Sequence, residues 1–130
     1  MWGNEYKSKQ GNIGVARAID YYVTNGYSVS IPMNDTQSYD LVVDDNIKLY
    51  RVSVKTTSYK APSGNYNVQL KNSGGSSGKS VIRNFDKTSC DILFVLCDNN
   101  DIYIIPIDDI DAHSAFTLTE ERKKYIRKLY

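Results

Sequence analysis

The segment that most constrains the fold is residues 91–97, Asp-Ile-Leu-Phe-Val-Leu-Cys, a nearly continuous apolar run. It has the length of one strand, and apolar residues at both sets of alternating positions indicate that both faces are covered. Residues 98–101 follow as a polar turn, and residues 102–106 return as a second strand. The chain therefore needs a central sheet with a layer on each side.

Two helices and four more strands are predicted around this pair. Apolar spacing favours a helix over residues 12–25, with Asn12 as its N-cap and Gly26 as its stop. Acids followed by bases suit the dipole of a final helix over residues 119–129. Alternating residue character predicts strands at 27–31, 39–44, 48–57 and 66–70. The expected fold class is α+β, a central mixed β-sheet flanked by helices in the order α-β-β-β-β-β-β-α.

The 130 residues suit one domain, 1–130, with a flexible Gly/Ser loop at 72–80. The 16 basic and 15 acidic residues nearly balance, so net charge alone does not indicate a nucleic-acid partner. No stretch approaches the ~20 apolar residues of a membrane span, and the first residues lack a signal-peptide pattern. Cys90 and Cys97 are too far apart along one strand to form a disulfide, so we expect two reduced thiols in a cytoplasmic protein.

Polar residues with chemical potential lie on the predicted hairpin. Strand side chains alternate, so Arg51, Ser53 and Lys55 share one face. A turn centred on residues 45–46 would place Asp40 opposite Arg51, diagonal to Ser53 and near Lys55. An acid and a lysine held together on a rigid sheet suggest metal-assisted phosphate chemistry. The alternative is a strand-initiating acid and a solvated edge lysine that form only a surface salt bridge.

Six segments of the chain follow one another in a characteristic order: 11–18, 25–32, 39–44, 48–56, 90–95 and 101–106. This order resembles the PD-(D/E)xK nuclease family, in the branch of the group I intron-type homing endonucleases, over roughly residues 9–108. The resemblance implies a restriction-endonuclease core. It also implies an enzyme that hydrolyses phosphodiester bonds of double-stranded DNA with Mg²⁺ or Mn²⁺.

The resemblance also implies roles for individual residues. Asp40 would bind the divalent cation together with the backbone carbonyl of Val54. Ser53 would orient a ligand or water, and Lys55 would stabilise the nucleophile or the phosphate. Two positions depart from the family pattern: Val15 stands where an acid on the first helix is usual, and Ser53 where Gln or Glu is usual.

Two acids are candidates to replace the acid missing at Val15. These are Asp20 and Glu5, although helical geometry places Asp20 about 140° around the axis from Val15. With one carboxylate left, we expect a lower affinity for the metal.

Basic residues on and after the hairpin are candidates for contact with the phosphate backbone, although ordinary solvated charges explain each one equally well. They are Arg51, Lys60, Lys71, Lys79, Arg83 and Lys87. A chain this short covers few base pairs, so a homo-oligomer, a dimer or a tetramer, is expected. The apolar segment 102–107 and the C-terminal helix are candidates for the interface.

A different class of function competes with the enzyme. Val15 and Ser53 favour a nuclease-fold protein that has lost catalysis and acts as a DNA-binding or inhibitor protein of a phage or mobile element. A small RNA-directed nuclease is a third reading. Each of these implies the cytoplasm of a bacterial or phage-infected cell.

Overall fold

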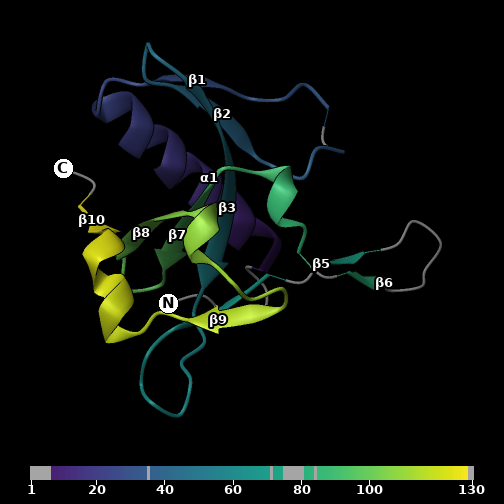
Figure 1. Ribbon diagram of the computed structural model, residues 1–130, viewed down its shortest axis with the longest axis vertical. Coiled ribbons are helices and arrows are strands. Elements are labelled where there is room, and N and C mark those ends of the chain that lie inside the picture. Colours follow the sequence, from purple (N-terminus) through teal and green to yellow (C-terminus); the bar gives the residue numbers. More distant parts are fainter. Residues whose placement is uncertain (1–6, 35, 71, 75–80, 84, 129–130) are drawn as a thin grey trace.

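A six-stranded mixed sheet forms the centre of the computed structural model, which describes residues 7–34, 36–70, 72–74, 81–83 and 85–128 (Figure 1). Its order is β1-β2-β3-β7-β8-β10; β3 and β7 are parallel and all other neighbours are antiparallel. The predicted α+β class with a mixed sheet is confirmed. The strands are β1 (Ser28–Ser30), β2 (Leu41–Asp44), β3 (Leu49–Thr57), β7 (Ile92–Cys97), β8 (Ile102–Pro106) and β10 (Ile126–Arg127).

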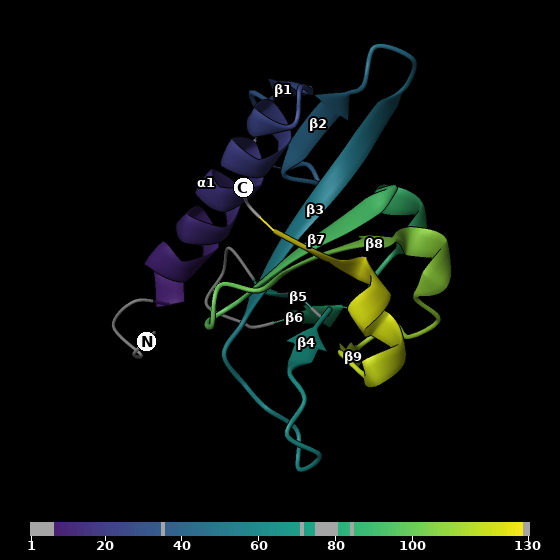
Figure 2. The same ribbon diagram turned by 90° about the vertical axis from the view of Figure 1, so that its left-hand side faces the viewer.

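One long helix, α1 (Lys7–Thr24), lies across one face of this sheet (Figure 2). The helix begins at Lys7, five residues before the predicted start at Asn12. The residues ahead of Asn12 are polar and show no apolar periodicity, so the sequence pattern did not indicate this helical turn. The end of the helix is as predicted. Gly26 has φ +87°, the Gly26 N–H donates to the Val23 carbonyl, and the Tyr27 N–H donates to the Tyr22 carbonyl. These two bonds form a Schellman cap, which requires the left-handed conformation that glycine adopts readily.

The opposite face is covered by a small second sheet and by short 3₁₀ helices. Strands β4 (Asn67–Gln69) and β9 (Ala115–Thr117) pair antiparallel there. The two faces of β7 accordingly enter two separate cores: Leu93 and Val95 pack on this side, whereas Phe94 and Leu96 pack under α1. Five of the six residues of β7 are buried, as the apolar run predicted.

The C-terminal segment differs from the prediction. Instead of one helix over residues 119–129, a 3₁₀ helix, η4 (Glu120–Tyr125), leads into β10, where Ile126 pairs with Tyr103 of β8. Strand β8 is therefore internal, and Ile102, Tyr103 and Ile105 are buried. The domain's own sheet and cores cover these three side chains, whereas Pro106 is exposed, and the oligomer interface stays a prediction.

Two smaller regions complete the fold. Strand β5 (Asn72–Gly74) pairs with β6 (Val81–Arg83), and the pair projects from the main sheet (Figure 1). The predicted flexible loop 72–80 thus begins with a strand, and residues 75–80 lie outside the described residues. The turn after β8 forms a 3₁₀ helix, η3 (Ile107–Asp109), and Cys90 and Cys97 are buried free thiols, as expected. Among the described helices, none is long and apolar enough to cross a membrane.

Candidate active site

The β2–β3 hairpin positions the candidate acid in a register different from the predicted one. Leu41 pairs with Val52 and Val42 with Arg51, so the prediction that Asp40 faces Arg51 is wrong by two residues. The turn is longer than assumed, since Asp45 Oδ1 accepts the backbone N–H groups of both Ile47 and Lys48. A shift of two residues preserves the face of a strand. Asp40 therefore moves along β3, from Arg51 towards Ser53, without changing sides.

Asp40 lies immediately before β2 and is bound to the edge of β3. Its N–H donates to the Val52 carbonyl at 2.9 Å, and its Oδ2 accepts the Val54 N–H at 2.7 Å. The backbone groups of alternate strand residues point to opposite neighbours. Val52 and Val54 therefore present their polar groups towards Asp40, whereas the Arg51 carbonyl accepts from Asp91 on the β7 side. The Val54 carbonyl consequently opens on the same edge as the Asp40 carboxylate.

Lys55 projects from β3 on the side away from α1. Its Nζ lies 5.7 Å from the centre of the Phe85 ring, and its side chain is half-buried. Burial lowers the pKa of Lys55, while the Asp40 carboxylate acts in the opposite direction. The two predicted partners are thus electrostatically coupled, and the lysine sits in a less polar environment than an edge lysine would. Phe85 was not foreseen, because nothing in the local sequence connects it with Lys55.

Ser53 and Cys90 lie deeper on the same side. Ser53 is 2% exposed, so its hydroxyl has almost no access to solvent. Burial, followed by the nearby Asp91 carboxylate, raises the pKa of the Cys90 thiol to about 11. A thiol with that pKa stays protonated near neutral pH and is a poor nucleophile. Cys90 therefore contributes packing beside Ser53 and Lys55.

The first helix lies close against β3 at Gly14. A Cβ at this position would lie 2.6 Å from Thr56 Cγ2 and 3.0 Å from Val54 Cγ1. Gln10 Nε2 also donates to Thr56 Oγ1 at 2.9 Å. The glycine and this hydrogen bond fix the start of α1 over the part of β3 that carries the candidate site.

Val15 lies next to Asp40, at the position where the family pattern has an acid. Its side chain has no oxygen that could bind a metal. It lines a pocket of about 340 Å³ together with Asp40, the carboxamides Asn12, Asn34 and Gln37, and the side chains of Ile31, Pro32 and Tyr39. Asp20 does not line this pocket and accepts a hydrogen bond from the Thr24 hydroxyl at 3.0 Å. Glu5 lies outside the described residues. Among those residues, no three His, Cys, Asp or Glu side chains gather as a metal site.

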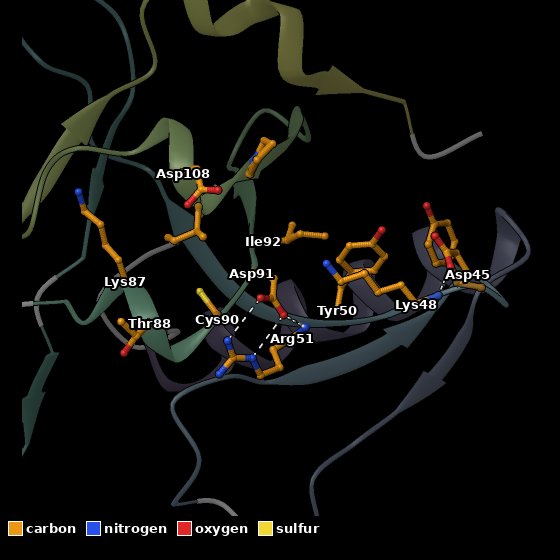
Figure 3. Close-up of a pocket in the computed structure, with 13 residues that line it drawn as sticks. Asp45, Lys48, Tyr50, Arg51, Lys87, Thr88, Cys90, Asp91, Ile92 and Asp108 are labelled. Atoms are coloured by element: carbon orange, nitrogen blue, oxygen red, sulfur yellow. Dashed lines mark hydrogen bonds and ion pairs between the residues drawn. The ribbon is translucent and has the colours of Figure 1, made fainter.

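Arg51 has a partner other than the predicted one. Its guanidinium bonds both oxygens of Asp91 at 3.3 Å, and its backbone N–H donates to Asp91 Oδ2 at 2.8 Å (Figure 3). Burial raises the pKa of Asp91, but the bonds from Arg51 outweigh it and the net shift is downward. This ion pair lies in a pocket of about 740 Å³ that Lys48 and Lys87 also line.

The other predicted phosphate contacts are dispersed or not described. Lys60 is exposed, and its Nζ lies 5.1 Å from the centre of the Tyr66 ring. Lys71 and Lys79 lie outside the described residues, and Arg83 belongs to β6, where only the backbone is described. Of the six candidates, the structure brings Arg51 and Lys87 together in one pocket.

Comparison with known proteins gives consistent results. The family model described as PD-(D/E)XK endonuclease matches residues 6–129. The solved structure of a bacterial homing endonuclease, I-Ssp6803I, superimposes with a TM-score of 0.78 at 25% sequence identity, covering 95% of this chain and 89% of that one. No curated protein matches the chain.

Proposed function

Because the chain belongs to the PD-(D/E)XK endonuclease family, we propose that it is a metal-dependent endonuclease of double-stranded DNA with its active site at Asp40, Ser53 and Lys55. The observation that carries this proposal is the 2.7 Å hydrogen bond from the Val54 N–H to Asp40 Oδ2. It holds a carboxylate beside the strand that carries Lys55, although the two residues are 15 positions apart in sequence.

The donor groups at this edge fit a hard divalent cation such as Mg²⁺ or Mn²⁺. Such ions take oxygen ligands and retain several waters. Asp40 and the Val54 carbonyl would hold the ion, since both open on the same edge of β3. When bound, the ion polarises a phosphate and makes its water more acidic. The lack of a carboxylate at Val15 implies weaker binding than a site with two acids would give.

The protein's own groups hold the reacting phosphate. The Lys55 ammonium would lie against the phosphate and balance the negative charge that grows as the phosphodiester is attacked. In the alternative role the lysine is neutral and accepts a proton from the attacking water, and its lowered pKa favours that form. Ser53 is a positioning residue in this scheme, because its buried side chain lies between Asp40 and Lys55 in sequence and on the same strand face as Lys55.

DNA would pass from the active site towards the Arg51–Asp91 pocket. Arg51 and Lys87 line that pocket and would contact phosphates, with Lys48 as an addition that sequence reasoning missed. Asp91 partly offsets the charge of Arg51, so Arg51 should contribute less to phosphate binding than a free arginine. Cutting both strands in one binding event would use two active sites, so a dimer or tetramer is proposed.

Cleavage of supercoiled plasmid in Mg²⁺ or Mn²⁺ tests the proposal. Asp40→Asn and Lys55→Met should each abolish metal-dependent nicking. Asp111→Asn and Lys123→Met, which remove exposed charges elsewhere on the surface, should not. Equal cleavage by all four variants would show that the site lies elsewhere.

The apolar Val15 beside Asp40 favours one competing function, a DNA-binding protein without catalysis. In that case the wild type leaves the plasmid intact at high protein concentration and still retards duplex DNA in a gel. The Val15→Glu variant separates the two functions further, because restoring the usual acid would create cleavage where none existed. RNA added as competitor in the same assay tests the RNA-directed reading.

A further inference from the structure

We infer that the carboxamide side chains of Asn12 and Gln37 take the place of the acid missing at Val15, so that the pocket beside Asp40 binds a divalent cation through one carboxylate and two amide oxygens. This inference rests on the proposed function and names the residues that complete its metal site. The family pattern does not predict it, because neither residue is an acid and Gln37 lies outside the first helix.

The placement of Asn12 supports the inference. Asn12 precedes Val15 by three residues, which is one turn of helix, so the two side chains share a face of α1. Both line the pocket that contains Asp40. Gln10 and Gly14 anchor this part of α1 against Thr56 of β3. The helix is therefore held in place next to the strand edge that carries the carboxylate.

The charge of the pocket favours a cation. Among the described residues that line it, Asp40 is the only charged one, and none is Lys or Arg. Asp40 Oδ2 accepts the Val54 N–H, whereas Oδ1 has no hydrogen-bond partner among the described residues. One carboxylate oxygen thus remains available for a ligand.

The amide oxygens differ in availability. Asn34 Oδ1 accepts the Thr36 N–H at 3.4 Å, so this amide is already engaged in its own loop. Asn12 and Gln37 are exposed, and neither makes a side-chain hydrogen bond within the described part of the chain. Amide oxygens are accepted ligands of hard cations, although they lack the charge of a carboxylate. Asn12 and Gln37 are therefore the two that can turn to the ion.

The inference can be tested without measuring cleavage, by titrating Mn²⁺ into the DNA-free protein. Binding is measured as the loss of the electron paramagnetic resonance signal of the free ion. The double variant Asn12→Ala, Gln37→Ala should lower the affinity about tenfold. The single variants Asn12→Asp and Gln37→Glu should raise it, because each converts a neutral ligand into a charged one at an exposed position. Gln69→Ala and Gln69→Glu, at an exposed carboxamide on β4, should change nothing.

The possible results separate this inference from the proposed function. If Asp40→Asn abolishes Mn²⁺ binding while the Asn12 and Gln37 variants bind as the wild type does, the amide ligands are refuted and the site at Asp40 stands. If Asp40→Asn binds Mn²⁺ normally, both the inference and the proposed metal site are wrong. Absence of Mn²⁺ binding to the wild type also overturns the inference. Circular dichroism of each variant verifies the fold.

Discussion

The two faces of β3 serve different purposes. On the face towards α1, Val52 is fully buried and packs with Val54, Ala18 and Phe94 in one apolar core. On the opposite face the same strand carries Ser53 and Lys55, where apolar side chains would bury more readily. A buried or half-buried polar group costs free energy unless it is fully paired. One face of β3 therefore stabilises the fold, and the other carries the polar side chains of the proposed active site at some cost in stability.

The largest expected effect concerns the polar face. Lys55→Met should lower single-turnover plasmid cleavage at least ~100-fold, which is the usual scale for losing a group that assists proton transfer or charge stabilisation. The free energy of unfolding should stay unchanged or rise by up to about 1 kcal/mol, because methionine fills a similar volume without a desolvated charge. Rapid-quench cleavage and urea unfolding measure the two quantities. A variant that is both inactive and strongly destabilised would contradict the division between the faces.

The apolar face should give the reverse pattern. Val52→Ala removes two methyl groups from a fully buried site and should cost about 2 kcal/mol of unfolding free energy. Cleavage per folded molecule should remain within about threefold of the wild type, because Val52 points away from Lys55. Urea unfolding, combined with activity measured well below the transition, provides the comparison. A large loss of cleavage in the fully folded variant would show that the faces are coupled.

A third change tests the contact between α1 and β3. Gly14→Ala places a methyl group 2.6 Å from Thr56 Cγ2 and should destabilise the protein by about 1–2 kcal/mol, even though alanine favours a helix. In a Thr56→Ser background, which removes Cγ2 and keeps the hydroxyl that accepts from Gln10, most of this cost should disappear. Thermal unfolding of the four proteins in the double-mutant cycle measures the interaction. Additive effects would place the strain elsewhere.

The smallest effect is a pH dependence. Burial lowers the pKa of Lys55 in the folded protein relative to the unfolded chain, where it is about 10.4. Between the folded pKa and the unfolded pKa the unfolded chain binds more protons, so stability rises as the pH rises through this window. The raised pKa of the Cys90 thiol acts in the opposite direction over the same range. The test is therefore the difference between two urea titrations: the slope of stability against pH should be more positive in the wild type than in Lys55→Met. Identical slopes would show that Lys55 is more solvated than its contact with Phe85 indicates.

Sequence patterns predicted the faces of the hairpin better than its register. The alternation of residues 51–55 depends only on the two-residue period of a strand, so Ser53 and Lys55 were placed on one face. The register depends on the turn, where the Asp45 side chain caps two backbone N–H groups and adds residues to the loop. Asp40 was therefore placed opposite Arg51, and the true partner of Arg51, Asp91, lies 40 residues further along the chain.

Long-range pairing also explains the other errors. Residues 119–129 have the charge order of a helix, but Ile126 pairs with Tyr103 of β8, and this tertiary contact overrides the local preference. The pocket beside Asp40 unites α1 with the loop before β2, so no local pattern could show that Asn12 and Gln37 are neighbours of the same carboxylate. The family order of segments, which reflects the fold as a whole, predicted that Asp40 and Lys55 act together, and the structure places Asp40 against the strand that carries Lys55.

The early end of β2 has a consequence for inhibition. Beyond Leu41 no strand among the described residues pairs with this edge of β3. The Asp40 side chain takes the place of the next backbone acceptor by binding the Val54 N–H. An extended peptide that paired with β3 at this point would compete with the carboxylate for that N–H and cover the Val54 carbonyl. If the proposed site is correct, such a strand mimic would block the cation and the phosphate together, and this edge of the sheet would be a point at which the protein could be inhibited.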